Sequence, residues 1–146
     1  PFLLDVDGAP DFNLSDTEGG TVVAVARGLR VGIDLERMDR QPRVQALAKR
    51  YFGKDEATAL ASLDGEAARR AFLLAWTTKE SSCKATGTGI YGWLDQWTFA
   101  CDAIGSDPQL TQVPNDATPL AAWPTSPCPT ANARAKPPAP RCCPWP

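Results

Sequence analysis

Two short motifs of this chain carry the residues whose types and spacing could do chemistry. The first, Gly32-Ile33-Asp34-Leu35-Glu36, alternates two carboxylates with apolar residues. The second, Trp76-Thr77-Thr78-Lys79-Glu80-Ser81-Ser82-Cys83-Lys84, sets one carboxylate between two lysines, and Gly87-Thr88-Gly89 follows it. Carboxylates bind hard divalent cations, and ammonium groups pair with phosphate oxygens. The two motifs together therefore suit a site for a divalent cation and a phosphate-bearing ligand.

Asp34 and Glu36 are two positions apart in an apolar run. On a β-strand, side chains with this spacing share a face and stand about 6.6 Å apart along the backbone. Two like charges on a face that is otherwise buried are unfavourable unless a cation lies between them. The alternative is a strand edge at which both acids are solvated, and the short motif taken alone leaves that alternative open.

Glu80 and Lys84 are four positions apart, so on a helix they share one face. The alternative to a functional pair is an exposed ion pair, which contributes only ~0.3–0.5 kcal/mol. Trp76 stands one turn earlier on the same stripe, which places Glu80 at the edge of the core. Lys79 is expected to point to a different rim of the helix.

The chain has 146 residues and no histidine. The lack of histidine excludes Ser-His-Asp and Cys-His catalysis and histidine-ligated zinc, so a general base has to be Asp, Glu, Lys, Tyr or Cys. A net charge of −2 provides no overall basic field to attract nucleic acid. The class of nucleic-acid-binding proteins is therefore disfavoured.

Cysteine usage and hydropathy bear on location. The five cysteines form no CxxC pair, which argues against structural zinc and favours reduced thiols over disulfides. No apolar run approaches the ~20 residues that a membrane span needs. The opening residues lack the basic flank of a signal peptide. We therefore expect a cytoplasmic protein with no membrane partner.

Apolar periodicity and turn residues predict a mixture of strands and helices within one domain at residues 1–116. The expected strands or extended segments are 2–7, 12–15, 21–26, 31–36, 91–101 and 110–113. The expected helices are one that has Pro42 near its first turn and stops at Phe52-Gly53, one at 54–63, and one at about 65–86 with Asp64 as its N-cap and Gly87 as its C-cap. Segment 21–26 is expected to be buried and to form a hairpin with 31–36.

Residues 117–146 differ from the rest in composition. Eight of the chain's 14 prolines lie in residues 124–146, and no aliphatic residue larger than alanine follows Leu120. Such a segment cannot bury a face, so we expect it to be disordered. We interpret it as a terminus translated out of frame, with a genuine proline-rich linker as the alternative.

The two motifs, at their spacing, resemble the two signatures of the 4'-phosphopantetheinyl transferases. Phe12-Asn13-Leu14-Ser15, followed by Val22-Val23-Ala24-Val25, also resembles the segment before the acidic motif in the longer, surfactin-synthetase-type branch. The resemblance covers roughly residues 1–100. It implies an α+β fold in which a small antiparallel sheet packs against one long helix and shorter helices. This fold would be one half, the C-terminal half, of that branch's pseudo-dimer.

The resemblance also implies a reaction, the transfer of 4'-phosphopantetheine from coenzyme A to a serine of an acyl or peptidyl carrier protein. Asp34, Glu36 and Glu80 would bind Mg2+. Glu80 would also deprotonate the carrier serine, and Lys84 would neutralise phosphate charge. The positions that would bind coenzyme A are Ser15, Asp16, Lys79 and Lys84.

Two departures from the family pattern bear on activity. Where the family has a histidine that helps to bind the 3'-phosphate of coenzyme A, this chain has Asp16, whose charge repels a phosphate. The chain also begins where the second half of the longer branch is about to start. One alternative is therefore a truncated, non-catalytic homologue that binds carrier protein or metal without turnover. A further alternative is a homo-oligomer that rebuilds a shared site between subunits.

Overall fold

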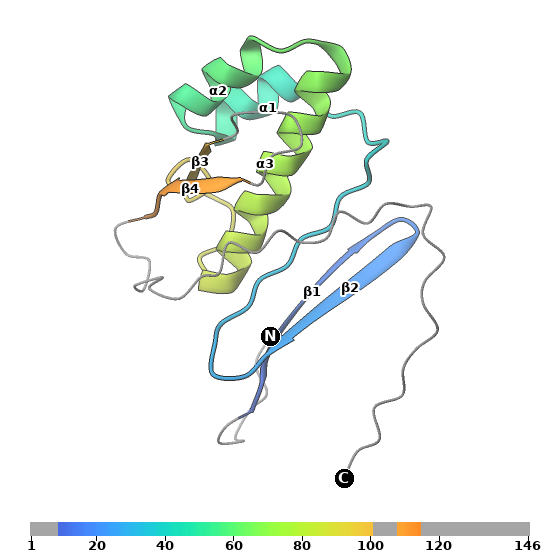
Figure 1. Cartoon of the computed structure of the whole chain (residues 1–146), viewed down its shortest axis with the longest axis vertical. Coiled ribbons are helices and arrows are strands. Elements are labelled where there is room, and N and C mark those ends of the chain that lie inside the picture. Colours follow the sequence, from blue (N-terminus) through green and yellow to red (C-terminus); the bar gives the residue numbers. More distant parts are fainter. Residues whose placement is uncertain (1–8, 101–107, 115–146) are drawn as a thin grey trace.

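The computed structural model describes residues 9–100 and 108–114, and Figure 1 shows how they are arranged. The elements in chain order are β1 (Asp11–Thr17), β2 (Gly20–Ala26), α1 (Val44–Tyr51), α2 (Lys54–Ala61), α3 (Gly65–Thr86), β3 (Thr98–Ala100) and β4 (Gln109–Gln112). The expected arm at 2–7 and tail at 117–146 lie outside these residues. Within them, no helix is both long and apolar enough to cross a bilayer.

The three helices and the β3–β4 pair enclose the hydrophobic core (Figure 1). Its centre is aromatic, because Phe52 stacks on Phe72 with 5.3 Å between ring centroids and Phe72 stacks on Trp76 at 5.5 Å. Phe72 and Trp97 are each only 1% exposed. The long helix α3 contributes more of these buried side chains than any other element, so packing along its buried face holds it against the other elements.

The expected helix 65–86 is confirmed as α3. It ends at Gly87, which adopts the left-handed conformation with φ 74° and donates its N–H to the Cys83 carbonyl oxygen. Glycine adopts this conformation at little cost, so it is the usual residue at a helix C-terminus. Asp64 is the N-cap residue, but its side chain makes no capping hydrogen bond.

The expected hairpin between segments 21–26 and 31–36 is wrong. β2 pairs with β1 in antiparallel register, with Phe12 opposite Val25 and Leu14 opposite Val23. The chain does reverse after β2, but residues 31–36 form no strand. They lie instead along the side chains of β1, which bind their backbone N–H groups.

Three hydrogen bonds hold that segment on β1. The backbone N–H groups of Val31, Ile33 and Leu35 donate to the side chains of Asp11, Asn13 and Ser15, at 2.7, 3.4 and 3.2 Å in that order. Both sets advance by two residues in the same direction, so residues 31–36 run parallel to β1. Because side chains of β1 bind the backbone N–H groups of residues 31–36, this segment does not pair with β2. The pairing partner of β2 is β1.

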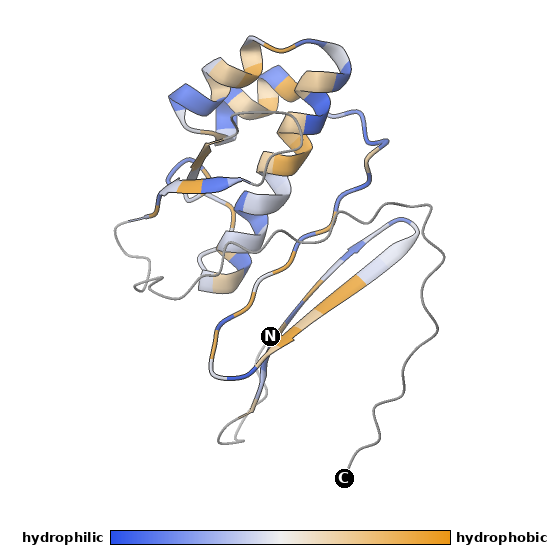
Figure 2. Cartoon of the chain, viewed as in Figure 1, coloured by the Kyte–Doolittle hydropathy of each residue, from blue (hydrophilic) through white to orange (hydrophobic). Residues whose placement is uncertain are grey.

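The expectation that segment 21–26 is buried is also wrong. Val23 is 58% exposed and Val25 64% exposed. Figure 2 shows β2 as a hydrophobic stretch on a hairpin that lies apart from the helices. A two-stranded hairpin buries a face only against another layer, and no element of the described ranges 9–100 and 108–114 covers this one.

Beyond α3 the chain forms a second small sheet. The expected strand 91–101 is shorter than predicted, because residues 91–96 are turns and only Thr98–Ala100 forms β3. The expected strand near 110–113 is confirmed as β4, which pairs with β3 in antiparallel fashion. The α+β class is confirmed, whereas the expected single sheet is, in the described residues, two separate two-stranded sheets.

Candidate active site

The candidate site forms where residues 31–36 meet the last turns of α3, and Gly32 makes this contact. A Cβ atom at Gly32 would lie 2.0 Å from the Ser81 carbonyl oxygen and 2.9 Å from the Ala85 Cβ. Atoms never approach that closely, so only glycine lets the two backbones meet. The contact brings Asp34, two residues further on, to the face of α3 that carries Glu80 and Lys84.

Lys84, Asp34 and Ser15 form a hydrogen-bonded cluster at this contact. The Lys84 Nζ donates to Asp34 Oδ1 at 2.7 Å, to the Ile33 carbonyl oxygen at 3.1 Å and to Ser15 Oγ at 3.2 Å. Ser15 Oγ donates to the same Asp34 Oδ1 at 3.0 Å. The Asp34 side chain is 5% exposed and that of Lys84 30%. Three separate parts of the chain therefore meet at one ion pair.

Glu80 lies beside this cluster with an altered pKa. Burial, and next the negative charge of Asp34, raise the pKa of Glu80 to about 7, and the positive charge of Lys84 opposes this rise. Beside it, Asp34 Oδ2 is buried without a hydrogen-bond partner. Glu80 is therefore about half protonated at neutral pH, at a place where a cation would meet two carboxylates.

The charges of Asp34 and Lys84 also act on the pKa of Glu36. Burial raises the pKa of Glu36, the Arg40 guanidinium lowers it, and the Asp34 carboxylate raises it. Its carboxylate is ion-paired with Arg40. In the parts of the chain that the structure describes, no three acidic or thiol side chains stand close enough together to form a ready metal site. Glu36 would have to leave Arg40 to join Asp34 and Glu80 on one ion.

The chemistry of the donors nevertheless fits Mg2+. The ligands available are carboxylate oxygens, which Mg2+ prefers, and it commonly keeps several waters, so a few carboxylates suffice. The buried, unpartnered Asp34 Oδ2 is the observation that calls for a cation or a proton.

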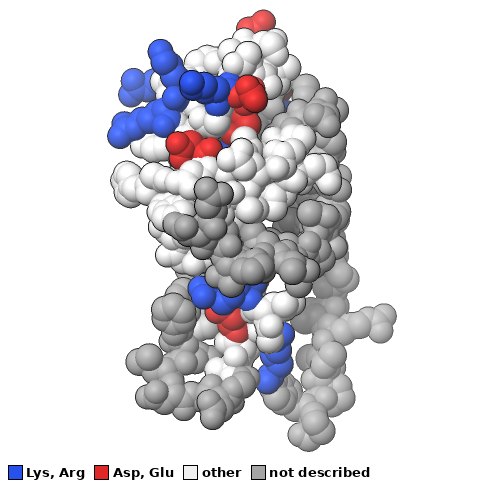
Figure 3. Space-filling model, turned by 90° about the vertical axis from the view of Figure 1, so that its left-hand side faces the viewer, with Lys and Arg blue, Asp and Glu red and all other residues white. Residues whose placement is uncertain are grey.

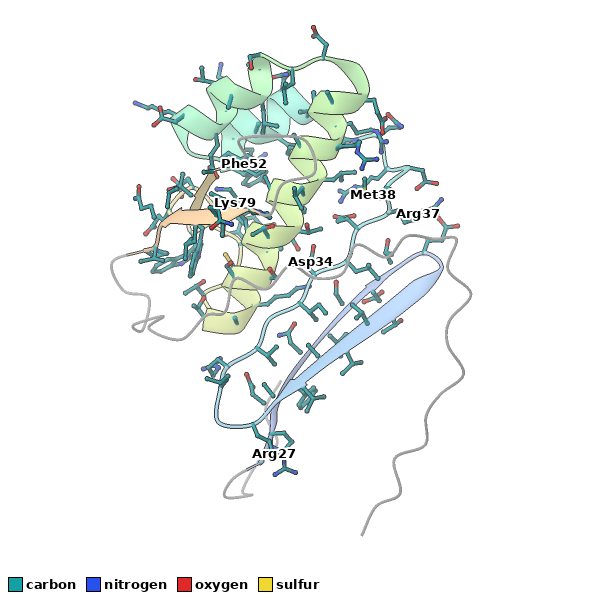
Figure 4. All side chains as sticks on the ribbon, in the orientation of Figure 1. Arg27, Asp34, Arg37, Met38, Phe52 and Lys79 are labelled. Atoms are coloured by element: carbon teal, nitrogen blue, oxygen red, sulfur yellow. The ribbon has the colours of Figure 1, made fainter. Side chains whose placement is uncertain are left out.

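Two of the expected site residues are not brought to this cluster. Asp16 is exposed and lies on the opposite face of β1 from Ser15, because side chains alternate along a strand. Lys79 is fully buried on another side of α3. Figure 4 shows Lys79 near Phe52 on one side of the helix and Asp34 on the other. The structure thus unites Ser15, Asp34, Glu80 and Lys84, with Glu36 at the margin.

Comparison with known proteins bears on what this cluster is for. The family model of the 4'-phosphopantetheinyl transferase superfamily matches residues 30–126. The chain belongs to this superfamily. The matched range contains Asp34, Glu36, Glu80 and Lys84, whereas Ser15 and Asp16 precede it.

Individual members of the superfamily agree with this assignment. A putative 4'-phosphopantetheinyl transferase of Synechocystis is 38% identical over 97 residues, which are 66% of this chain and 39% of the relative. The Nostoc 4'-phosphopantetheinyl transferase HetI is 40% identical over 79 residues, covering 54% of this chain and 33% of its own. The Bacillus pumilus 4'-phosphopantetheinyl transferase psf-1 is 35% identical over 109 residues, covering 74% and 44%. The chain therefore spans less than half the length of the transferases it matches.

Sequence reasoning missed two residues that shape the site of this superfamily member. Arg40 holds Glu36, and Glu56 holds Lys79. Glu56 stands three residues after Gly53, the N-cap of α2, where a glutamate often binds the backbone of the helix start. That spacing was the available signal for Glu56. No pattern in the sequence indicated Arg40, because residues 36–40 are not helical.

Proposed function

We propose that this chain supplies the reaction centre for Mg2+-dependent transfer of 4'-phosphopantetheine from coenzyme A to a serine of an acyl or peptidyl carrier protein. The observation that carries the proposal is the Lys84–Asp34–Ser15 cluster next to Glu80, because it joins an ammonium donor, a buried acid and a titratable acid at one point. We further propose that the chain is one half of a pseudo-dimer and works in the cytoplasm.

Asp34, Glu36 and Glu80 are the residues that would hold Mg2+. Bound there, the ion would neutralise charge on the pyrophosphate of coenzyme A. Asp34 has one oxygen engaged by Lys84 and Ser15 and one oxygen free for this purpose.

Glu80 is the proposed base. The serine oxygen of the carrier protein forms a bond to the β-phosphorus of coenzyme A, and the bond from that phosphorus to the bridging oxygen breaks. Adenosine 3',5'-bisphosphate leaves, and the serine proton passes to Glu80. The Glu80 carboxylate lies beside Asp34 and Lys84, and it would accept this proton directly or through a water.

Lys84 is the proposed phosphate contact. An ammonium group has three N–H donors, and here all three are occupied, by Asp34, Ser15 and the Ile33 carbonyl oxygen. A phosphate oxygen would therefore replace one of these acceptors. Ser15 is the longest of the three contacts at 3.2 Å and is therefore the acceptor most readily replaced; its Oγ would still accept the Leu35 N–H and donate to Asp34 Oδ1.

Mass spectrometry of a carrier protein tests the proposal. The chain is incubated with coenzyme A, Mg2+ and an apo acyl or apo peptidyl carrier protein, and the carrier is expected to gain the mass of 4'-phosphopantetheine. Glu80→Gln should abolish the gain, whereas Glu66→Gln, a change at an exposed glutamate of the same helix, should not. Binding of carrier protein or Mg2+ without any gain of mass would favour the non-catalytic alternative. Light scattering on the eluting protein reports whether activity requires an oligomer.

Calorimetry tests the metal site separately. Asp34→Ala should weaken Mg2+ binding in the presence of coenzyme A by at least about tenfold, since it removes a direct ligand. Unchanged Mg2+ affinity in this variant would show that the ligand assignment is wrong.

A further inference from the structure

Lys79 is the most completely buried charged residue of the described part of the chain, and it faces away from the proposed reaction centre. Its side chain is 0% exposed. Its Nζ donates to Glu56 Oε2 at 2.6 Å, to the Leu94 carbonyl oxygen at 2.8 Å and to the Trp97 carbonyl oxygen. Figure 3 shows Lys and Arg side chains on the surface in two places, near the upper end and in the lower half of this view, and Lys79, which is 0% exposed, adds nothing to the surface.

Glu56 completes a closed network around Lys79. Its Oε2 also accepts the Gly53 N–H at 2.9 Å, and its Oε1 accepts the Phe99 N–H at 3.0 Å. The pair therefore ties α3 to the start of α2, to the turn before β3 and to β3 itself. A buried charge without a partner strongly destabilises a protein, so removing either Lys79 or Glu56 alone would leave the other charge in an unfavourable position.

The network around Lys79 also affects the position of Glu80 and Lys84, because all three residues lie on α3. Lys79 precedes Glu80 directly, and on a helix neighbouring residues differ in direction by roughly 100°. A side chain about 6 Å from the helix axis moves by about 1 Å when the helix turns by about 10°. A small rotation of α3 would thus carry Glu80 and Lys84 away from Asp34.

We propose that Lys79 and Glu56 are a positioning pair that fixes the rotation of α3 and so aims Glu80 and Lys84 at Asp34. Neither residue touches the substrate. This inference rests on the proposed function for its effect on turnover, but its effect on the contacts of Lys84 is independent of any reaction. It replaces the expectation that Lys79 itself binds coenzyme A.

Three variants and one control test the pair in the full chain. Glu56→Gln and Lys79→Met each remove one charge, and the double variant Glu56→Met with Lys79→Met removes both, so that no lone charge stays buried. Glu66→Gln alters an exposed ion pair at the start of the same helix and serves as the control. Circular dichroism and urea unfolding establish that each protein is folded.

NMR of 15N-labelled lysine ammonium groups reads the geometry of the site without turnover. In the wild-type chain the Lys84 ammonium should give a slowly exchanging signal, because three oxygens hold its protons. We expect this signal to broaden or vanish in Glu56→Gln, in Lys79→Met and in the double variant, and to persist in Glu66→Gln. An unchanged Lys84 signal in the folded variants would overturn the proposal.

Kinetics and binding separate positioning from ligand contact. We expect the transfer rate to fall about 100-fold in both single variants, the size of effect that a misplacement of about 1 Å produces, with any loss of coenzyme A affinity equal in the two because Lys84 is displaced in both. Weaker coenzyme A binding in Lys79→Met alone would show that Lys79 contacts the ligand, and would overturn the proposal. Failure of all three variants to fold would assign the pair to stability only. If the wild-type chain transfers nothing, the proposed function fails while the NMR comparison still decides the positioning role.

Discussion

The two faces of α3 differ in how completely their charged groups are hydrogen-bonded, although the buried Trp97 Nε1, from a residue that contacts Lys79, also lacks a partner. On one face, the Lys79–Glu56 pair is enclosed, and Lys79 together with both oxygens of Glu56 has hydrogen-bond partners. On the other face, Asp34 keeps an unpartnered oxygen and Glu80 retains its proton to about neutral pH. Buried polar groups are normally paired, and exceptions concentrate at functional sites. The difference agrees with the proposed function, in which the second face binds ligands and the first face stabilises the fold.

The largest effect on stability should come from the core beside the enclosed face. Phe72→Ala removes a side chain that is 1% exposed and stacks on both Phe52 and Trp76. Loss of a buried phenylalanine costs about 3–5 kcal/mol through lost transfer energy and the cavity left behind. Urea unfolding measures this change. A loss below about 1 kcal/mol would show that this core is loosely packed.

The contact at Gly32 should have the next largest effect, on activity more than on stability. Gly32→Ala places a Cβ 2.0 Å from the Ser81 carbonyl oxygen, so residues 31–36 must move off α3 and take Asp34 with them. We expect the transfer rate to fall about 100-fold, equivalent to about 2.7 kcal/mol. Gly20→Ala is the matched control, because its Cβ would meet only Leu35 Cδ2 at an ordinary 3.8 Å. Equal rates for the two variants would contradict the proposed role of the contact.

The dependence of stability on pH should show a smaller effect. Because the pKa of Glu80 is raised from 4.5 to about 7, the folded chain binds a proton there that the unfolded chain has released. Without Mg2+, stability should therefore fall as pH rises from about 4.5 to 7, by about 1 kcal/mol after allowance for solvent screening. The raised pKa of Glu36 acts in the same sense. Thermal melts of wild type and Glu80→Gln measure this, and the variant should show the shallower slope.

The exposed face of the hairpin should be the least sensitive region. Val25→Thr alters a residue that is 64% exposed on β2, and surface changes of this kind stay within about 0.5 kcal/mol. Urea unfolding under the conditions used for Phe72→Ala allows direct comparison. A much larger loss would reveal that the hairpin face is covered in solution by something beyond residues 9–100 and 108–114.

The sequence predicted the helices well because their signals are local. The end of α3 follows from Gly87, and its buried stripe follows from apolar residues at helical spacing. The family resemblance also implied that Asp34, Glu80 and Lys84 belong to one site, although these residues are far apart in the chain, and the structure brings Asp34 to Lys84. The partner of β2 could not be predicted in this way, because pairing depends on side chains of β1 that compete for the backbone of residues 31–36.

The direction of Lys79 shows a second limit. Spacing indicated that Lys79 and Lys84 would leave the helix on different sides, but not which side would be buried. That outcome depends on Glu56 and on the Leu94 and Trp97 carbonyl groups, which the turns at residues 91–96 bring to α3. These contacts join residues far apart in the chain, and no local pattern encodes them.

The side-chain bonds from β1 to residues 31–36 have a consequence for alignment along the strand. Asp11, Asn13 and Ser15 are polar and face the segment, whereas Phe12 and Leu14 alternate with them. A slip of one residue would place Phe12 and Leu14 opposite two of the three N–H donors and leave those donors unbonded. Backbone hydrogen bonds between two strands can form again after such a slip, because every residue has the same backbone groups. The bonds from β1 side chains cannot, because they need polar residues at particular positions. The alternation of polar and apolar residues in β1 therefore sets the position of Asp34 along the strand. An insertion or deletion within β1 should be far less tolerated than one in the connection at residues 27–30.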